Sequence, residues 1–260
     1  MRNDVSDEII SVLDYAVERY NNIEFISNDP IQIPHRFIQK EDIEIAGFLV
    51  ATIAWGNRKS IVRNGMKLMQ LMDESPYRFL MDNDFLTGRE EEILRFVHRT
   101  FNGEDCLFFL NSLQNIYKNY GGLETVFTDG YNQSETIRSS LKYFREVFLA
   151  FPHDKRAEKH ISDVFSGSAA KRLNMFLRWM VRKDDKGVDF GLWSHIPMAK
   201  LMLPLDVHTG NVSRNLGLLV RTQNDWKAVE EITEILRKLD KNDPVKYDFA
   251  LFGLGVDALI

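Results

Sequence analysis

Hydrophobic residues recur along most of the chain at the three- and four-residue spacing of an α-helix. Stripes of this kind run through residues 9–17, 43–54, 61–72, 93–97, 109–116, 137–148 and 229–236. Alternation with a period of two, which is typical of a half-buried strand, is nearly absent. The pattern therefore predicts an all-α protein without a sheet.

Turn-forming residues divide these helical stretches. The two prolines of residues 28–34 favour extended backbone there, since each proline biases its predecessor away from the helical region. Asp243 and Pro244 predict the start of the last helix, as its N-cap and its first residue. No stretch has the composition of a flexible linker, so we expect residues 1–260 to form one compact helical unit. Further breaks are expected at Gly121-Gly122, Asp129-Gly130 and Phe151-Pro152.

Composition and cysteine content exclude several classes of protein. Of the 260 residues, 44% are hydrophobic and 27% are charged, which is ordinary for a soluble globular protein. No apolar run approaches the roughly 20 residues that span a bilayer, and the acidic, polar N-terminus lacks a secretory pattern, so a cytoplasmic protein is expected. The single cysteine, Cys106, lies in an apolar helical stretch and predicts a buried thiol. One cysteine forms neither an intramolecular disulfide nor a four-cysteine metal site.

Positive charge is concentrated in one segment of an otherwise acidic chain. The formal net charge is −5. Residues 154–186 carry nine Lys and Arg against five Asp and Glu, a net +4, so the rest of the chain carries −9. Such a segment is typical of a local anion site, although the acidic total argues against a general nucleic-acid binder. The six histidines show no ligand spacing with a carboxylate on one helix face, so we expect no metal and no other cofactor.

Lys171 is the candidate nucleophile within this segment. The small residues of positions 166–170 predict a tight turn, after which a helix begins. The first turn of a helix has unpaired backbone N–H groups and a positive field, which favours the neutral, nucleophilic amine of a partly desolvated lysine. The alternative is a solvated surface lysine beside a phosphate-binding helix start. Lys171 shares a polar stripe of this helix with Asn174, Arg178 and Arg182, opposite an apolar face.

Asp206 belongs to the most specific string in the chain, Leu203-Pro204-Leu205-Asp206-Val207-His208-Thr209-Gly210. Its position predicts an N-cap for the following helix, whose hydrogen bonds would hold the carboxylate ionised. A structural cap explains the residue by itself, and a carboxylate fixed in this way is also suited to stabilise a developing cation. His208 and Thr209 fall in the first turn behind it, and Arg214 lies two turns on, where it can reach a phosphate.

Together the two segments resemble the helix-hairpin-helix DNA glycosylases, the superfamily of endonuclease III and the 8-oxoguanine glycosylases. In that family a Leu-Pro-Gly-Val-Gly-x-Lys hairpin places a lysine at a helix start, and a Val-Asp-Thr-His-type motif supplies an aspartate. Residues 165–171 match the spacing of the hairpin, with Ser166 in place of the proline and Ala169 in place of the second glycine; residues 205–209 match the aspartate motif. The chain is also similar to a bacterial family that shares the Pro-Leu-Asp-Val-His-Thr-Gly string, and its lysine-to-aspartate interval resembles that of archaeal 8-oxoguanine glycosylases.

The resemblance implies a two-lobed helical bundle with a cleft between a central lobe, residues 39–165, and a lobe of residues 1–38 and 166–260. It implies double-stranded DNA with a damaged or abasic nucleotide as the partner, and a DNA repair glycosylase/AP lyase that removes a damaged or oxidised base. Lys171 would attack C1′ while Asp206 stabilises oxocarbenium character at that carbon. The residues expected to bind nucleic acid are Gly167, Ser168, Ala169, Arg172, Asn174, Arg178, His208, Thr209, Arg214, Trp55, Asn57, Arg58, His35 and Arg36.

Several assignments have alternatives. Trp55, Asn57 and Arg58 follow a helical stretch where family members insert side chains into the duplex, but core packing also explains Trp55. His35 and Arg36 either face the cleft or belong to an exposed connection. For the whole chain, a non-catalytic nucleic-acid-binding protein on the same fold is favoured by the altered hairpin and the net charge. An enzyme that recognises a base or nucleoside in small or RNA substrates is the third hypothesis.

Overall fold

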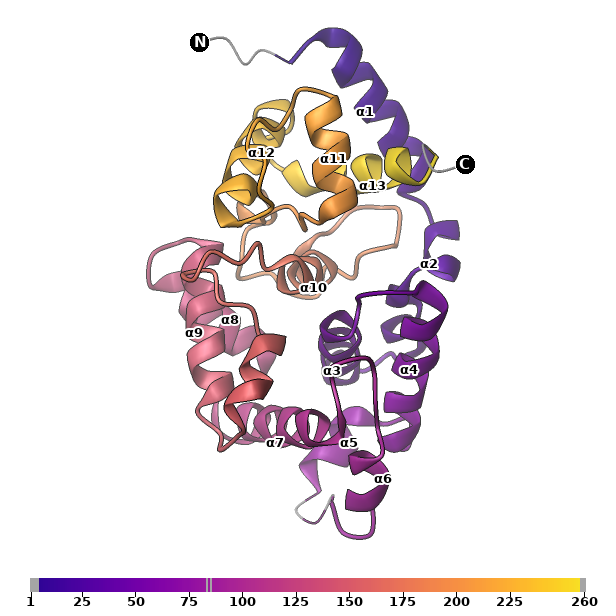
Figure 1. Ribbon diagram of the computed structural model, residues 1–260, viewed down its shortest axis with the longest axis vertical. Coiled ribbons are helices and arrows are strands. Elements are labelled where there is room, and N and C mark those ends of the chain that lie inside the picture. The colour runs from indigo at the N-terminus through magenta and orange to yellow at the C-terminus, as the bar shows by residue number, and fades with distance from the viewer. Residues whose placement is uncertain (1–4, 83, 85, 258–260) are drawn as a thin grey trace. The chain divides into compact units, whose positions relative to one another are not determined.

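The computed structural model describes residues 5–82, 84 and 86–257, and helices are the regular elements of this part of the chain (Figure 1). Extended backbone pairs there at two isolated bridges, His98 with Phe101 and Ser168 with Asp225. The prediction of an all-α protein is confirmed. None of the described helices is long and apolar enough to cross a membrane.

The chain divides into two compact units. The first comprises the N-terminal residues through Ser27 and the residues from Asp163 onward, and the second comprises Asn28–Ser162. The expected lobe boundaries differ from these chiefly in residues 28–38, which the structure groups with the second unit. The physical reason is burial: Ile33 is fully buried over Gly65, where an added Cβ would lie 2.4 Å from its Cδ1.

The first unit contains both ends of the described chain and most of its later helices. Its helices are α1 (Asp7–Tyr20), α2 (Glu24–Asn28, whose last residue falls in the second unit), α10 (Lys171–Val181), α11 (Val207–Asn215), α12 (Trp226–Leu239) and α13 (Tyr247–Asp257), with 3-10 turns η4 (Met198–Lys200) and η5 (Pro244–Lys246). Helix α13 packs against both α1 and α11 (Figure 1). Gly253 permits the close approach of α1, because a Cβ there would lie 2.1 Å from the Tyr20 ring.

The second unit contains the remaining helices. These are η1 (Pro30–Gln32), η2 (Pro34–Arg36), α3 (Lys40–Thr52), α4 (Arg58–Leu71), α5 (Pro76–Met81), α6 (Glu90–Leu94), α7 (Gly103–Asn119), α8 (Leu123–Asn132), α9 (Ile137–Leu149) and η3 (Lys155–His160). Helix α3 packs against α4 and α5, and α8 packs against α9. Cys106 is fully buried in α7, and burial raises the pKa of its thiol to about 12.

Two predicted breaks are wrong for physical reasons. Asp29 is extended as expected, but the rest of residues 28–34 is not, because Pro30 and Pro34 each occupy the first position of a 3-10 turn, where the fixed φ of proline is favourable. Asp129-Gly130 does not end a helix but lies inside α8. Gly130 serves helix packing there, since a Cβ would lie 2.9 Å from the Cα of Ser140 in α9.

Candidate functional site

The turn before α10 is held by its own side chains. The Asp163 carboxylate accepts hydrogen bonds from the backbone N–H groups of Phe165 (2.9 Å) and Ser166 (3.2 Å), and from the Ser166 hydroxyl (2.7 Å). Gly167 is exposed with φ +92°, a backbone conformation that favours glycine. The predicted tight turn is confirmed, and its tip is exposed.

The N-terminus of α10 leaves backbone donors available. Ala170 adopts the left-handed conformation with φ 47°, and its N–H donates to the Ser168 hydroxyl (3.2 Å). The N–H groups of Ala169 and Lys171 have no hydrogen-bond partner among the residues that the structure describes. Free N–H groups at the positive end of a helix are suited to hold an anion such as a phosphate.

Asp206 is the N-cap of α11, as the sequence predicts. Its Oδ1 accepts from the Thr209 N–H (2.9 Å), and the Thr209 hydroxyl accepts from the Asp206 N–H (2.9 Å), which completes a reciprocal capping box. The side chain of Asn224 donates to the Asp206 carbonyl (3.0 Å). These bonds fix the carboxylate and direct only one of its oxygens toward the cap.

The other carboxylate oxygen of Asp206 contacts Lys171. The distance from Lys171 Nζ to Asp206 Oδ2 is 3.3 Å, and the side chains are 33% and 25% exposed, respectively. Burial opposes ionisation of Asp206, but the Lys171 ammonium and the Thr209 hydrogen bonds outweigh it and lower the pKa of the carboxyl. The predicted proximity of the two side chains is confirmed, and in the resting protein they form a partly desolvated ion pair.

Two buried arginines, Arg178 of α10 and Arg182 at its C-cap, form a second charged cluster in the interior. Arg178 Nε donates to Asp189 (3.2 Å) and its Nη1 donates to Asp248 of α13. Arg182 pairs with Asp189 (3.0 Å), Asp184 (2.8 Å) and Asp243 (2.9 Å). Burial opposes the charge of Arg182, but these aspartates outweigh it and raise the pKa of the guanidinium.

The predicted helix start at Asp243 and Pro244 is confirmed in part. Asp243 is the N-cap residue of η5, and Pro244 is the first residue of that turn. The Asp243 carboxylate makes no cap hydrogen bond; it accepts from Arg182 Nε instead. Arg182 is buried, so this carboxylate compensates the charge of the guanidinium instead of capping the turn.

The aspartate partners of this cluster were missed by sequence reasoning. Along the chain, Asp189 lies 11 residues and Asp248 lies 70 residues from Arg178. Asp189 lies 7 residues and Asp243 lies 61 residues from Arg182. The three- and four-residue spacing of a helix therefore connects none of these pairs. One available signal was the composition of residues 175–181, which leaves α10 apolar around most of its circumference. A helix of that kind is buried, and its arginines then require acidic partners.

Several expected nucleic-acid ligands are buried or hydrogen-bonded within their unit. Arg178 and Asn174 are 4% and 1% exposed, because the polar stripe of α10 lies within its unit. Thr209 is 2% exposed and its hydroxyl serves the capping box. Arg214 donates to the Arg221 carbonyl (2.8 Å) and to Asn224 (2.6 Å), so its guanidinium holds a loop.

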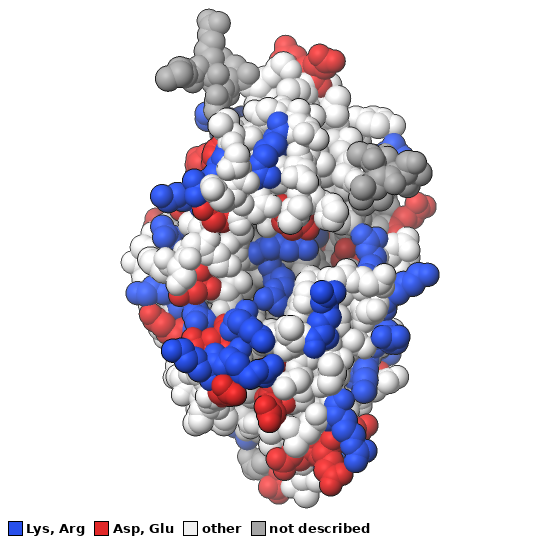
Figure 2. All heavy atoms as spheres, in the orientation of Figure 1, with Lys and Arg blue, Asp and Glu red and all other residues white. Residues whose placement is uncertain are grey.

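The surplus of positive charge in residues 154–186 is correspondingly smaller at the surface. Arg178 and Arg182 are neutralised by buried aspartates, and burial lowers the pKa of Arg172 to about 10. Figure 2 shows acidic and basic side chains interspersed on the face that it draws. Gly167, Ser168, Ala169 and His208 remain accessible or half-buried, and they stay candidates for a phosphate or base contact.

Three of the five expected ligands in the second unit have structural contacts within it: Trp55, Asn57 and Arg36. Trp55 is half-buried between His98 and His160, with ring centroids 5.0 and 5.9 Å away, so the core-packing alternative describes it. Asn57 caps α4 through the Ser60 N–H (3.2 Å). Arg36 pairs with Glu74 (3.1 Å). His35 is half-buried, and Arg58 is exposed at the start of α4.

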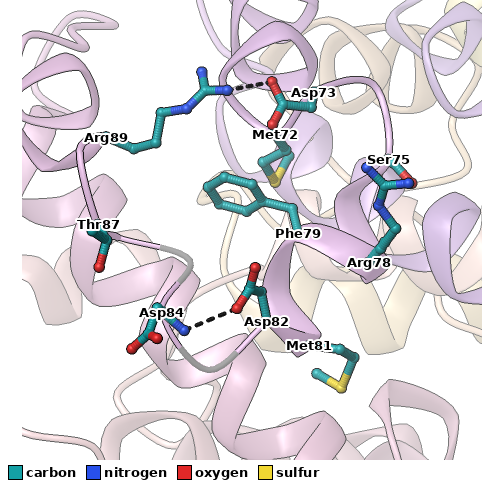
Figure 3. Close-up of a pocket in the computed structure, with 10 residues that line it drawn as sticks. All are labelled: Met72, Asp73, Ser75, Arg78, Phe79, Met81, Asp82, Asp84, Thr87 and Arg89. Atoms are coloured by element: carbon teal, nitrogen blue, oxygen red, sulfur yellow. Dashed lines mark hydrogen bonds and ion pairs between the residues drawn. The ribbon is translucent and has the colours of Figure 1, made fainter.

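A pocket of about 540 Å³ in the second unit contains none of the expected site residues (Figure 3). Its apolar side is formed by Met72, Phe79 and Met81, and Arg89 contacts Asp73 across it (2.6 Å). Charges of both signs line it, so it favours no one class of ligand. Within residues 5–82, 84 and 86–257, no group of three or more His, Cys, Asp or Glu side chains is arranged to hold a metal ion.

Substitutions at Asp206 should separate its cap role from its charge. We expect Asp206→Ala to lower the free energy of unfolding by about 1 kcal/mol, and Asp206→Asn to lower it less, because asparagine also caps helices. Folding lowers the pKa of the Asp206 carboxyl. The ionised carboxylate therefore stabilises the folded protein at pH values above the unfolded-state pKa, and this stabilisation is lost as the pH falls through the folded-state pKa.

Urea unfolding of the three proteins at pH 7 and pH 3 tests this. The wild type and Asp206→Asn should differ less at pH 3 than at pH 7. Equal stability of the alanine and wild-type proteins at pH 7 would contradict the cap assignment.

Comparison with known proteins identifies a family for most of the chain. Residues 29–257 match the family model described as "Protein of unknown function (DUF2400)". Comparison with curated proteins and with solved structures gives no match. The matched range includes the turn, the lysine at the start of α10 and the aspartate that caps α11. The chain belongs to the DUF2400 family.

Proposed function

We propose that the protein is a DNA glycosylase/AP lyase of the helix-hairpin-helix type, with Lys171 as nucleophile and Asp206 as the assisting carboxylate. The observation that carries the proposal is the 3.3 Å contact between Lys171 Nζ and Asp206 Oδ2. Their residues are 35 positions apart, and each stands at the beginning of its own helix. A lysine and a carboxylate in contact, partly desolvated yet accessible, are the two groups that the reaction requires.

The chemistry assigns a separate step to each group. An ionised Asp206 stabilises positive charge at C1′ as the glycosidic bond breaks and its electron pair leaves with the base, which takes up a proton. The Lys171 amine, after losing its proton, forms a bond to C1′, and opening of the sugar ring gives a Schiff base. Loss of a C2′ proton then expels the 3′ phosphate by β-elimination.

The turn and helix start favour a nucleic-acid substrate over a free nucleoside. The free N–H groups of Ala169 and Lys171 offer donors to a backbone phosphate beside the reacting sugar. The exposed Gly167 lets a strand approach the backbone closely, since a Cβ at this position would meet nothing within 4 Å. A phosphate held here would bring the adjacent C1′ toward the amine.

A non-catalytic nucleic-acid-binding protein is the second candidate. It is favoured by the ion pair itself, because the Lys171 amine is engaged by the Asp206 carboxylate at 3.3 Å, whereas attack on C1′ requires an amine with a free electron pair. In that case the same turn and helix start would bind phosphates without turnover. The two candidates differ in whether a covalent adduct forms.

Borohydride trapping on duplexes that carry abasic sites or oxidised bases tests the proposal. The wild-type chain is incubated with each duplex and reduced, and the attached residue is mapped by mass spectrometry. We expect an adduct on Lys171. Salt-dependent DNA binding without an adduct or base release on any duplex would support the second candidate and overturn the first.

A further inference from the structure

Helix α4 of the second unit carries a row of basic side chains on its solvent-exposed face. Lys59, Arg63 and Lys67 are spaced by four residues, and all three are exposed. Residues four apart lie on one face of a helix, so these side chains follow one another along about 12 Å of its axis. Figure 2 shows basic side chains in succession on the side of the molecule where Figure 1 labels α4. We call these three residues the basic row.

The basic row lacks acidic partners. Helix α4 has no Asp or Glu among its 14 residues, and none of the three side chains forms an ion pair within the part of the chain that the structure describes. Other exposed cations of the same unit do form ion pairs. Arg36 contacts Glu74 at 3.1 Å, and Arg95 contacts Glu91 at 3.1 Å. The side chains around the basic row therefore do not neutralise its charge.

The position of the basic row in its helix is electrostatically unfavourable in the free protein. The N-terminal end of a helix carries partial positive charge, and α4 begins with Arg58 and Lys59 and has no acid in its first turn. Like charges four residues apart on a helix repel each other, which applies to Lys59 with Arg63 and to Arg63 with Lys67. An anion that lies along this face would relieve both kinds of repulsion.

A fourth cation lies at the N-terminal end of α4. A Cβ at Gly56 would lie 2.6 Å from Nη1 of Arg99, and Gly56 directly precedes Asn57, the N-cap of α4. Gly56 has φ +99° and no side chain, so the chain leaves room there for the guanidinium. Arg99 is exposed and, like the basic row, forms no ion pair with the described residues. The positive surface therefore continues past the start of the helix.

We propose that the basic row, with Arg99 at its N-terminal end, binds the phosphate backbone of a nucleic acid as a surface separate from the Lys171–Asp206 site. One strand of a duplex carries a phosphate for about every 3.4 Å of its axis, so a row of about 12 Å can face roughly three to four phosphates. Lysine and arginine contacts of this kind position a strand without reading its sequence. The inference rests on the proposed function in taking nucleic acid as the partner.

The buried face of α4 favours a nucleic acid over a lipid surface as this partner. A helix that binds a membrane places its own apolar face in the lipid. The apolar side chains of α4, among them Ile61, Leu68 and Met69, are instead buried inside the second unit. A phosphate backbone requires only the exposed, charged face of the helix.

Fluorescence anisotropy with a labelled DNA duplex tests this surface in the full chain. The row variant combines Lys59→Gln, Arg63→Gln and Lys67→Gln. We expect it to bind at least about tenfold more weakly than the wild type at about 100 mM salt, whatever the sequence of the duplex. The slope of log K against log salt concentration should become shallower by about 2 to 3, since each lost phosphate contact removes about 0.9.

A control variant makes the same chemical changes on three separate helices of the same unit. Arg78→Gln, Lys118→Gln and Lys142→Gln remove exposed cations from α5, α7 and α9. The net charge changes by the same amount, but the affinity should fall by less than about threefold and the salt slope should change by less than about 0.5. An unchanged affinity in the row variant, or an equal loss in both variants, overturns the proposal.

Urea unfolding distinguishes a binding surface from a structural one. Because the charges of the basic row repel one another and the helix dipole, the row variant should unfold at the same urea concentration as the wild type or at a higher one. A midpoint well below that of the wild type would show that these side chains stabilise the fold, and it would remove the reason for assigning them to a partner.

Adduct trapping and two other polyanions separate this inference from the proposed function. An adduct on Lys171 together with equal DNA affinity in the wild type and the row variant removes the surface and leaves the lyase. Weaker DNA binding by the row variant, without an adduct on any duplex, leaves the surface and removes the lyase. Binding that depends on the basic row but occurs only with phosphatidylserine vesicles or polyglutamate, and not with DNA, overturns the assignment to nucleic acid.

Discussion

Replacing Lys171 with alanine is expected to abolish the borohydride-trapped adduct, with a loss of at least about 1000-fold in its rate of formation. A Schiff base requires a primary amine at C1′, and alanine has none. Lys171→Arg keeps the positive charge beside Asp206, but a guanidinium does not form the adduct. We therefore expect both variants to lose the adduct and Lys171→Arg to retain more DNA binding, measured by anisotropy at fixed salt.

The loss should reflect chemistry and not unfolding. A partly exposed ion pair such as Lys171–Asp206 contributes only about 0–1 kcal/mol to stability, so both variants should remain folded by circular dichroism and thermal melting. Lys183→Ala removes an exposed lysine of the same unit and should leave the adduct unchanged. If Lys171→Ala still forms the adduct at the wild-type rate, another amine is the nucleophile and the assignment fails.

Arg182→Met is expected to lower the free energy of unfolding by about 3–5 kcal/mol. Arg182 is 1% exposed and pairs with Asp184, Asp189 and Asp243. Methionine fills much of the same volume but leaves these carboxylates without their shared cation. Asp189 keeps Arg178 and Asp184 keeps Asn21 as partners, but at neutral pH Asp243 must either keep an uncompensated charge in the interior or take up a proton, and both are costly.

Urea denaturation of Arg182→Met beside Lys183→Met measures this effect. The control makes the same chemical change at the next residue, which is exposed, and should alter stability by less than about 0.5 kcal/mol. A loss below about 1 kcal/mol in Arg182→Met would mean that the aspartates are satisfied without the arginine. A loss of the expected size identifies Arg182 as the centre of the buried charge cluster.

Local sequence patterns predicted much of the secondary structure and the helix cap at Asp206. The apolar face of α10, with Leu173, Phe176 and Leu177, is buried as its spacing predicts. Asp206 caps α11 because a carboxylate before an amphipathic stretch meets free N–H groups three residues on. Such features depend on neighbours within about four residues, and therefore they can be deduced without the fold.

Other features depended on contacts that local patterns do not encode. Gly130 in α8 has the composition of a break, yet it lies mid-helix because Ser140 of α9 occupies the space of a side chain. The polar residues Asn174, Arg178 and Arg182 have the spacing of an exposed stripe, yet they are buried. The solvation of the two arginines is replaced by aspartates, most of them beyond the reach of any helical spacing, and Asn174 donates to the Ala169 carbonyl at 3.1 Å.

For this protein the sequence alone determined the helical class, the cap at Asp206 and the lysine at the start of a helix, because each follows from periodicity or from the free groups of a helix end. The tertiary structure decided that the lysine and the aspartate touch, at 3.3 Å. It also decided that Arg178 and Arg182 are buried and paired with aspartates. Burial and long-range pairing set these outcomes, since a charge leaves water only where the fold supplies its partner.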